Sequence, residues 1–299
     1  MTGHSGHPQF TLEGHVFLAR PLAAGLHLVA TPLGNLGDIS FRALSTLAAA
    51  DTILCEDTRV TSRLLQRFAI ATRMRPYHDH NAARVRPAIL EELRNGARIA
   101  LVSDAGMPAV SDPGYKLVRA CIDEDLPVDV IPGPTAPVTA LALSGLPTDR
   151  FLFAGFLPAK ATQRRSQLTE LAAVPATIIL FESASRLAAC LADISDIMGD
   201  RQVAVTRELT KLHQEALRGT APELIQEIEA RGGVKGEITL LVAPPGVAGP
   251  ASVADVAERL RDLLETHPAS KAAAMLARET GQPRAQLYEL AMQLKDLKK

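Results

Sequence analysis

The sequence predicts an α/β protein with two domains and a small helical module after them. From Gly25 onward, short apolar runs alternate with segments of helical periodicity, as strands joined by covering helices do. The alternation resumes after a turn-rich break at Ser144–Arg150 and ends at a Pro/Gly-rich linker, Pro244–Pro250. We therefore divide the chain into a flexible N-terminal extension at residues 1–24, an N-terminal α/β domain at 25–147, a C-terminal α/β domain at 148–243 and a helical tail at 251–299.

The first domain is predicted to contain a parallel sheet. Its apolar runs predict strands at Leu26–Ala30, Thr52–Cys55, Ile99–Val102 and Val128–Ile131. The segments between and after them predict helices at Phe41–Ala50, Arg59–Phe68, Ala82–Asn95 and Tyr115–Asp123. The strands are apolar throughout rather than alternating, which is typical of parallel strands buried on both faces.

The second half again alternates predicted strands with predicted helices, and after the linker only helices are predicted. Strands are predicted at Phe151–Ala154, Thr177–Phe181, Val203–Thr206 and Ile238–Ala243, and helices at Arg165–Ala172, Leu187–Ile197 and Pro222–Ala230. After the linker, three short helices are predicted at Val253–Glu265, Lys271–Thr280 and Arg284–Leu297.

Charge and composition restrict the partners and the compartment. The formal net charge is -1 and Trp is absent, so neither a global positive field nor a set of aromatic platforms indicates nucleic acid. Any RNA contact must come from local patches. The three cysteines are far apart and have no disulfide spacing, and no apolar run is long enough to cross a membrane. We expect a cytoplasmic protein without a membrane segment.

Gly/Pro-rich or polar segments directly follow the predicted strands of the first domain. They occupy residues 31–38, 56–59, 103–114 and 132–137. In open parallel sheets, ligands bind beyond the carboxyl ends of the strands, where these segments converge. One such loop would be an ordinary turn, but four together favour a shaped pocket.

The predicted pocket lacks the glycine motifs that hold phosphates. No G-x-G-x-x-G follows the first strand and no G-x-x-x-x-G-K-[ST] occurs, which disfavours a nucleotide-dependent enzyme of another class. S-adenosylmethionine, a nucleoside without phosphate, needs only backbone groups and one or two carboxylates. Asp104 could bind it through its carboxylate, or could instead cap a helix or turn, and the loop alone does not separate the two interpretations.

Nine motifs carry a resemblance to a known family. In the first half these are L-V-A-T-P-L-G-N-L-G-D-I-S (28–40), E-D-T-R (56–59), L-V-S-D-A-G-M-P-A-V-S-D-P-G (101–114) and V-I-P-G-P-T-A (130–136). In the second half they are G-F-L-P (155–158), F-E-S-A-S-R (181–186), R-E-L-T-K (207–211), R-G-T (218–220) and K-G-E (235–237). Together they resemble the bacterial 16S ribosomal RNA cytidine 2′-O-methyltransferases, a family of the tetrapyrrole methylase superfamily.

The resemblance implies a fold, a cofactor and a substrate. It implies a two-domain tetrapyrrole-methylase-like fold, that of the class III methyltransferases, with S-adenosyl-L-methionine in the cleft of a homodimer. The substrate would be a cytidine ribose 2′-hydroxyl in the decoding region of 16S rRNA, within the small ribosomal subunit. Carried over by motif, the cofactor-binding residues are Leu33, Ser103, Asp104, Ala105, Gly106, Val110, Thr135, Ala136, Glu182 and Gly219.

Two motifs of this sequence differ from those typical of related proteins. The tetrapyrrole enzymes typically carry G-D-P where this chain has Ser103-Asp-Ala-Gly, which favours the RNA branch. The family's E-[SA]-P-H-R motif reads Glu182-Ser-Ala-Ser-Arg186 here, so Ala184 and Ser185 replace Pro and His.

Lys211 and Glu182 are the predicted catalytic residues. They lie in second-domain motifs that should face the cleft, where a cation or a general base would assist methyl transfer. Each could instead form half of an ion pair at the rim. No metal site is predicted, because the Y-H-D-H segment at Tyr77–His80 alone is weak evidence for one.

Local basic groups are the candidate RNA contacts. Arg59, Arg63 and Arg67 recur at i and i+4 along one predicted helix. The other candidates are Lys160, Arg164 and Arg186. Such residues could also form an ordinary solvated face.

The sequence does not decide what the tail does, and it leaves two alternative functions for the protein. Residues 269–291 resemble a helix-turn-helix-like module appended to this family, which could dock RNA or merely cap the second domain. A methylase of a tetrapyrrole or another small molecule, and a non-catalytic RNA-binding assembly factor, are the alternative functions.

Overall fold

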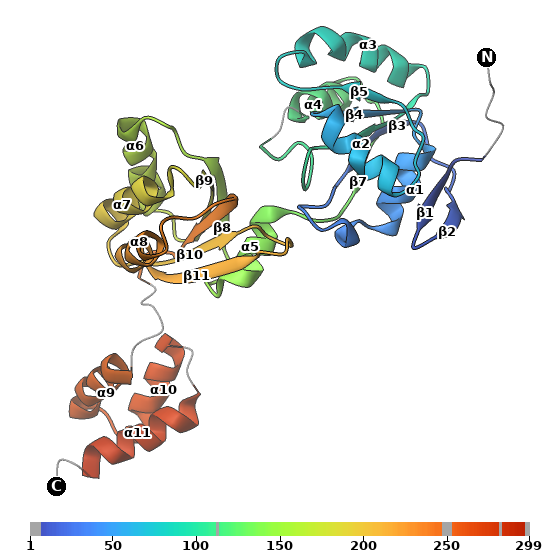
Figure 1. Ribbon diagram of the computed structural model, residues 1–299. Helices are drawn as coiled ribbons and strands as arrows, with labels where there is room; N and C mark the ends of the chain where they lie inside the picture. The colour runs from blue at the N-terminus through green and yellow to red at the C-terminus, as the bar shows by residue number, and fades with distance from the viewer. Residues whose placement is uncertain (1–6, 112–113, 247–252, 281–282, 297–299) are drawn as a thin grey trace.

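The computed structural model describes residues 7–111, 114–246, 253–280 and 283–296, which form two α/β domains and a separate group of three helices (Figure 1). The first domain contains a five-stranded parallel sheet. Its strand order is β5 (Met74–Pro76), β4 (Thr52–Cys55), β6 (Arg98–Leu101), β3 (Gly25–Val29) and β7 (Val128–Ile131). Every neighbouring pair is parallel, as predicted from the continuously apolar runs. The short strand β5 was not predicted, because Met-Arg-Pro contains no apolar run.

Helices cover both faces of this first sheet. On one face lie α1 (Phe41–Ala49) and α2 (Thr58–Arg67), and on the other lie α3 (Ala82–Arg94) and α4 (Tyr115–Asp123). The alternation of side chains along a strand separates the two cores, so that Ile53 packs with α1 and α2 while Leu54 packs with α3 and α4. This three-layer arrangement leaves the carboxyl ends of the strands open to loops.

A β-hairpin precedes the first sheet, where a flexible extension was predicted. Strands β1 (Gln9–Leu12) and β2 (His15–Leu18) pair antiparallel, and the buried side chain of Phe10 packs in the α1–α2 core. The turn uses Glu13 and Gly14, both with positive φ. The prediction is therefore wrong for residues 9–18, and residues 1–6 lie outside the described part of the chain.

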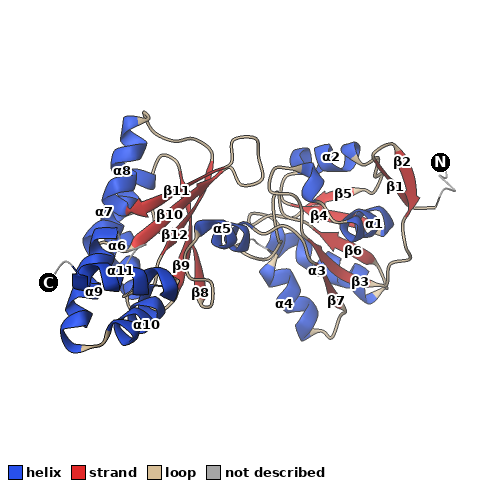
Figure 2. Cartoon of the chain, turned by 90° about the horizontal axis from the view of Figure 1, so that it is seen from below, coloured by secondary structure: helices blue, strands red, loops and turns tan. Residues whose placement is uncertain are grey.

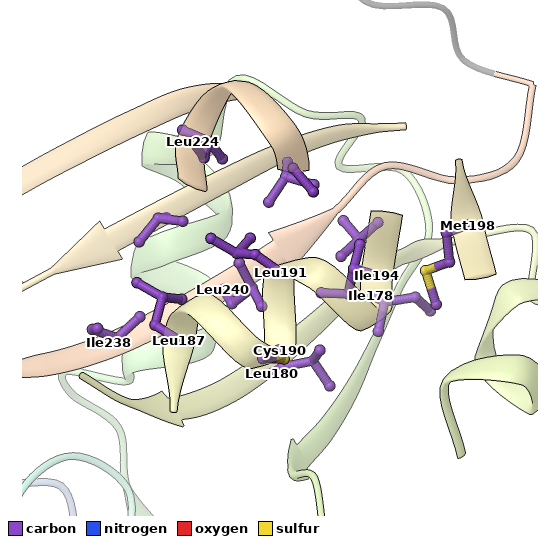
Figure 3. Packing of buried hydrophobic residues seen from close by; sticks show 14 of the residues in the cluster. Ile178, Leu180, Leu187, Cys190, Leu191, Ile194, Met198, Leu224, Ile238 and Leu240 are labelled. Atoms are coloured by element: carbon purple, nitrogen blue, oxygen red, sulfur yellow. The ribbon is translucent and has the colours of Figure 1, made fainter. Parts of the chain in front are cut away.

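The second domain has a five-stranded mixed sheet. Its order is β11 (Glu215–Thr220), β10 (Gln202–Arg207), β12 (Glu237–Val242), β9 (Thr177–Ser183) and β8 (Phe151–Phe156). Only β8 and β9 pair in parallel, and the other neighbours are antiparallel. The helices α6 (Ala161–Ala172), α7 (Leu187–Met198) and α8 (Ala221–Ala230) cover one face over an aliphatic core (Figure 3).

Helix α5 (Ala136–Ser144) covers the opposite face of the second sheet. Ala140 and Leu141 pack in one cluster with strand residues of this sheet, and α5 lies between the two sheets in Figure 2. The helix precedes the boundary that we predicted between residues 147 and 148, but it packs on the second domain. Leu33, from the loop after β3, belongs to the same cluster, so the two domains share apolar contacts at α5.

The C-terminal helices form a core of their own. The helices α9 (Val253–Thr266), α10 (Ala269–Thr280) and α11 (Arg284–Asp296) enclose Leu260, Leu276 and Leu287, which are nearly fully buried. The three predicted helices are confirmed within one or two residues at most ends. Within the described ranges, no helix combines the length and the apolar character that a membrane span requires.

Candidate active site between the two sheets

The loops after β3 and β6 meet at a crevice in the first sheet. These two strands are neighbours in the sheet, but the chain leads from β3 to a helix on one face and from β6 to a helix on the other. Open α/β sheets bind ligands in the crevice that such a pair of strands creates. Thr31 and Gly106 exchange two backbone hydrogen bonds, of 2.9 and 3.0 Å between N and O. The Thr31 hydroxyl also donates to the carbonyl of Ser103 at 3.1 Å. The two loops thus form one continuous wall.

Gly106 holds this wall close to its neighbours. Its φ is +82°, and a Cβ there would lie 3.2 Å from Cδ2 of Leu33 and 3.7 Å from the Pro134 carbonyl oxygen. Both the conformation and the space favour glycine at this position. Three loops therefore converge on Gly106, as the sequence predicted.

Asp104 ties a further loop to the same wall. Its Oδ1 accepts a hydrogen bond of 3.0 Å from the backbone N–H of Asp57, the residue that caps α2. Hydrogen bonds from the side chain and backbone of Arg59 lower the pKa of Asp57 to about 2. The 56–59 and 101–114 motifs are thus joined in space. Of the two interpretations of Asp104, this contact supports the turn-stabilising one and leaves ligand binding a prediction.

A cavity of about 440 Å³ lies between the domains. Its volume falls within the range of small-molecule sites. The lining residues are Leu33, Ala105, Ala136, Phe156, Phe181, Glu182, Ser183, Ala184, Gly236, Glu237, Ile238 and Thr239. Four predicted cofactor residues, Leu33, Ala105, Ala136 and Glu182, are therefore brought together.

The other predicted cofactor residues do not line the cavity. Ser103, Asp104, Gly106, Val110 and Thr135 belong to the loops that form or adjoin the first-domain wall. Gly219 lies on β11, paired with Val203. A Cβ on Gly219 would lie 2.9 Å from the Glu223 carboxylate, which caps α8 together with Thr220, so this glycine has a local structural role.

Lys211 lies at the rim of the cavity, held between two carboxylates. Its Nζ is 3.0 Å from Oε1 of Glu208 and 3.2 Å from Oε2 of Glu237, a residue that lines the cavity. Burial lowers the pKa of Lys211, but the two carboxylates outweigh burial, so the pKa is raised overall. Lys211 is therefore a fixed cation at neutral pH rather than a base.

Two glycines explain the motifs around this lysine. A Cβ on Gly34, in the loop after β3, would overlap Cγ of Lys211 and lie 2.7 Å from its Cε. A Cβ on Gly236 would overlap the Glu208 carboxylate, which accepts a hydrogen bond of 3.0 Å from the backbone N–H of Glu237. The motifs at 207–211 and 235–237 thus form one ion-pair cluster, and its lysine touches the first domain.

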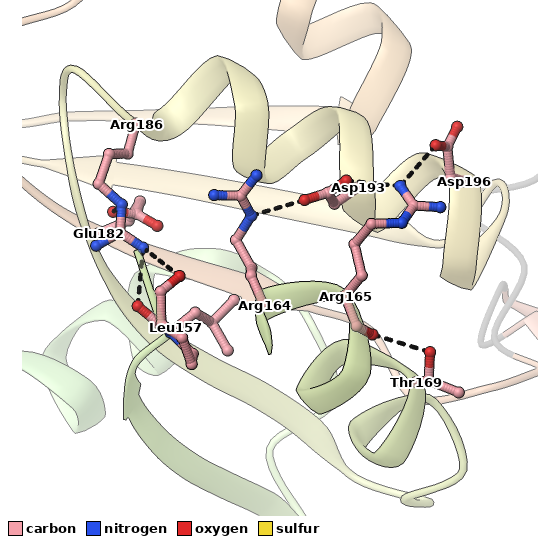
Figure 4. Close-up of polar contacts among 9 residues, drawn as sticks. Leu157, Arg164, Arg165, Thr169, Glu182, Arg186, Asp193 and Asp196 are labelled. Carbon is pink, nitrogen blue, oxygen red and sulfur yellow. Dashed lines mark hydrogen bonds and ion pairs between the residues drawn. The ribbon is translucent and has the colours of Figure 1, made fainter. Parts of the chain in front are cut away.

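Glu182 differs from Lys211 in its surroundings. It is only 3% exposed, and it lies on the same face of β9 as Ile178 and Leu180 of the second-domain core. Its Oε1 accepts a hydrogen bond of 2.8 Å from the N–H of Ser183. The same oxygen lies 3.3 Å from Nε of Arg186, which is drawn beside Glu182 in Figure 4. This geometry favours the ion-pair interpretation for Glu182.

Two of the predicted RNA contacts already have partners within the second domain. Arg164 is 6% exposed, and its Nε donates to Asp193 at 2.6 Å (Figure 4). Arg186 donates to the carbonyl of Leu157 at 2.8 Å and to that of Pro158 at 3.1 Å. The prediction is contradicted for Arg164, because its guanidinium is buried and paired. Arg186 is partly exposed, so its contact with phosphate stays a prediction although two carbonyls already hold its guanidinium.

The remaining basic candidates are exposed. Arg59, Arg63 and Arg67 all lie on the solvent side of α2, although Arg59 forms an ion pair with Asp57 at 2.6 Å. Lys160 is exposed at the N-cap of α6. These four side chains stay candidates for phosphate contact.

Several cavity residues were missed from the sequence. Phe156 and Phe181 supply an aromatic wall, and Gly34 and Glu237 set the position of Lys211. Their motifs were recognised, but only the pairing of β12 with β9 and β10 brings Glu237 to Lys211. Among the described residues, no group of three or more His, Cys, Asp or Glu side chains is placed to hold a metal ion.

Comparison with protein families gives two matches. The Tetrapyrrole (Corrin/Porphyrin) Methylases model matches residues 25–225, and the RsmI C-terminal HTH domain model matches residues 250–295. Among curated proteins, the ribosomal RNA small subunit methyltransferase I of Mesorhizobium japonicum is 50% identical over 93% of this chain and 95% of its own length. The protein of the same name from Erythrobacter litoralis is 48% identical over 94% of this chain and 99% of its own length.

Solved structures of low sequence identity share the fold. A cobalt precorrin-4 methyltransferase of cobalamin biosynthesis matches with a TM-score of 0.55 at 19% identity, over 73% of this chain and 94% of its own. A diphthine synthase matches with a TM-score of 0.57 at 14% identity, over 73% and 89%. A Thermus thermophilus uroporphyrin-III C-methyltransferase, complexed with S-adenyl homocysteine, matches with a TM-score of 0.51 at 19% identity, over 73% and 96%. The two family models and the curated relatives that match nearly the whole chain show that the protein belongs to the tetrapyrrole methylase family, in its ribosomal RNA small subunit methyltransferase I branch.

Proposed function

We propose that this protein transfers a methyl group from S-adenosylmethionine to the ribose 2′-hydroxyl of a cytidine in the decoding region of 16S ribosomal RNA. Its family makes it an S-adenosylmethionine-dependent ribosomal RNA methyltransferase. The observation that carries the finer proposal is the protonated Lys211 at the rim of an interdomain cavity. A hydroxyl that accepts a methyl group loses a proton and develops negative charge on its oxygen, which a nearby cation stabilises. A ring nitrogen with a free lone pair develops no such charge, so the cation favours a hydroxyl as the acceptor.

The cavity fits the cofactor in size and in chemistry. Leu33, Ala105 and Ala136 provide apolar surface on the first-domain side, and the polar residues Glu237 and Thr239 line the cavity on the other. Gly106 keeps Leu33 and the loop after β7 at close approach, so that a side chain there would push against Leu33, which lines the cavity. When bound, S-adenosylmethionine supplies a methyl group already activated by its sulfonium.

Lys211 would stabilise the charge that develops on the attacking oxygen. A ribose 2′-oxygen becomes negative as its proton leaves, and a fixed cation within a partly dry site lowers the energy of that state. Glu208 and Glu237 hold the ammonium, and the contact with Gly34 holds the side chain against the first-domain loop. The lysine thus needs no reorganisation during the reaction.

The exposed basic residues support docking to the small ribosomal subunit. Arg59, Arg63, Arg67 and Lys160 would contact phosphates, which position a substrate without reading its sequence. Because the net charge is only -1, attraction to bare RNA is weak, and an assembled subunit should be preferred. We propose that the helical tail adds a docking surface.

We further propose that the enzyme works as a homodimer in the cytoplasm. Cys55, Cys121 and Cys190 are all free and buried, which agrees with a reducing compartment. Light scattering on the purified protein would test the dimer, for which a mass of one chain would be the contradicting result.

The proposed reaction is tested by labelling small subunits taken from cells that lack this protein. Purified enzyme and methyl-tritiated S-adenosylmethionine are added, and the 16S RNA is digested to nucleosides. We expect the label in 2′-O-methylcytidine and, in a parallel digestion with a base-specific ribonuclease, in a single oligonucleotide from the decoding region. Label in a base-methylated nucleoside, or transfer to a porphyrinogen and none to subunits, would contradict the proposal.

A further inference from the structure

Phe156 is a large apolar side chain of the cavity that the proposed function leaves without a role. It belongs to the 155–158 motif at the end of β8, lines the cavity and is 61% exposed. By contrast, Leu33 and Ile238 of the same lining are 8% and 3% exposed. An aromatic ring this exposed at the mouth of a site loses the stabilisation that burial would give it.

A bulge in β8 directs Phe156 toward the cavity. Opposite β9, Phe153 pairs with Ile179 and Gly155 pairs with Leu180, so Ala154 is an extra residue in the ladder. Without it, Phe153 and Phe156 would point to opposite faces of the sheet, because side chains alternate. With it, Phe156 pairs with Phe181 and shares the face of Phe153. Bulges re-aim side chains next to functional sites in this way.

The neighbours of Phe156 fix one side of its ring and leave the other side open. The Phe181 ring lies 5.4 Å from it between centroids, at an interplanar angle of 55°, and Phe153 in turn lies 4.9 Å from Phe181. At Gly155, where φ is +68°, a Cβ would lie 3.2 Å from the Ser111 hydroxyl of the first domain. Phe156 therefore projects where the two domains meet.

We propose that Phe156 stacks on the pyrimidine base of the target nucleotide and so positions its ribose for methyl transfer. This inference rests on the proposed function. Nucleobases stack on aromatic side chains whatever their hydrogen-bonding edges, and RNA-modifying proteins hold splayed-out bases this way. Leu33, Ile238 and Thr239 of the lining are buried, whereas the Phe156 ring is exposed at the mouth of the cavity. The exposed ring therefore meets the partner that arrives from outside, the RNA, rather than the adenine of the cofactor.

Phe156→Ala and Phe156→Leu test the proposal on the full chain with subunits that lack the modification. We expect the KM for subunits to rise roughly 5- to 150-fold, the range that loss of one aromatic–base stack gives. The affinity for S-adenosylhomocysteine should stay within about twofold, and Phe156→Tyr should restore the wild-type KM. Phe151→Ala is the matched control, since Phe151 is 46% exposed on the same strand but does not line the cavity.

Two results would overturn this role. A KM for Phe156→Ala equal to that of wild type would exclude stacking on the target. A loss of S-adenosylhomocysteine affinity as large as the loss in methylation would assign the ring to the cofactor instead. Failure of the wild-type enzyme to label subunits would instead contradict the proposed function itself. The wild-type reaction, which is run beside the variants, measures this outcome independently.

Discussion

The two walls of the interdomain cavity are built by different means. The first-domain wall consists of loops whose backbone is held by paired hydrogen bonds between Thr31 and Gly106 and by close contacts at glycine, and its lining side chains, Leu33, Ala105 and Ala136, are all apolar. The second-domain wall carries the aromatic and charged side chains, a ring at Phe156 and an ion-pair cluster at Lys211. A backbone wall suits the binding of a fixed cofactor, whereas side chains suit a variable acceptor and the charge that develops on it. We infer that binding and chemistry are divided between the walls.

The largest expected effect is the loss of the lysine from the second wall. Lys211→Met should lower kcat for subunit methylation about 10²–10³-fold, the usual consequence of removing one charge-stabilising group. Cofactor affinity should change little, because the lysine is paired with Glu208 and Glu237. Single-turnover methylation and calorimetric titration of S-adenosylhomocysteine measure the two quantities. Lys116→Met on α4 is the control, and a wild-type rate for Lys211→Met would remove this lysine from the chemistry.

Gly34→Ala should reproduce much of that loss without removing the charge. Its Cβ would overlap Cγ of Lys211, so the lysine must move away from both carboxylates or the loop must shift. We expect kcat to fall about 10²-fold, since small displacements at a reacting centre are costly. Gly37→Ala is the matched control in the same loop, where a Cβ meets only the Asn35 side chain, at 3.2 Å. Equal rates for the two variants would show that Gly34 does not position Lys211.

Gly106→Val tests the first wall and should affect binding instead. A branched side chain at φ +82° strains the backbone and fills space beside Leu33. We expect S-adenosylhomocysteine affinity to fall at least tenfold while the protein still folds. Gly96→Val is the control, because Gly96 has φ +84° but open space around its Cβ, which separates backbone strain from steric filling. Unchanged affinity in Gly106→Val would exclude this loop from the site.

Removal of the helical tail should spare both walls. A chain ending at Gly246 keeps every cavity residue, and the tail packs around its own core. We expect normal cofactor affinity and melting temperature, with a KM for subunits raised about tenfold through lost docking contacts. If the tail is instead a structural cap, melting temperature and cofactor affinity will fall together.

The first wall could be predicted from sequence and the second could not. Parallel strands place their carboxyl ends at one edge, so the strand pattern alone predicts that the loops at Thr31, Glu56 and Ser103 converge. The second sheet is mostly antiparallel, and a single inserted residue, Ala154, decides which face Phe156 occupies. A bulge of this kind leaves no periodic signal that separates it from an ordinary strand.

Two charged residues of the second domain also show where prediction from sequence fails. Lys211 and Arg164 both follow strands in second-domain motifs or loops, and both were predicted to be functional. The structure leaves Lys211 at the cavity rim but buries Arg164 against Asp193 beneath α7. Burial of a charge depends on which helix packs above it, and that depends on the tertiary arrangement of α6 and α7. The hairpin at residues 9–18 was missed for a similar reason, since it is anchored by tertiary packing of Phe10, Leu12 and Phe17 against the α1–α2 core.

The division between the walls is tested most directly by a double-mutant cycle on cofactor affinity. S-adenosylhomocysteine is titrated into wild type, Gly106→Val, Lys211→Met and the double variant. We predict that Lys211→Met leaves the affinity unchanged on both backgrounds, so that the two effects add within about 0.5 kcal/mol. A tenfold loss of affinity in Lys211→Met alone, or a coupling energy above about 1 kcal/mol, would show that the two walls bind the cofactor jointly and would contradict the division.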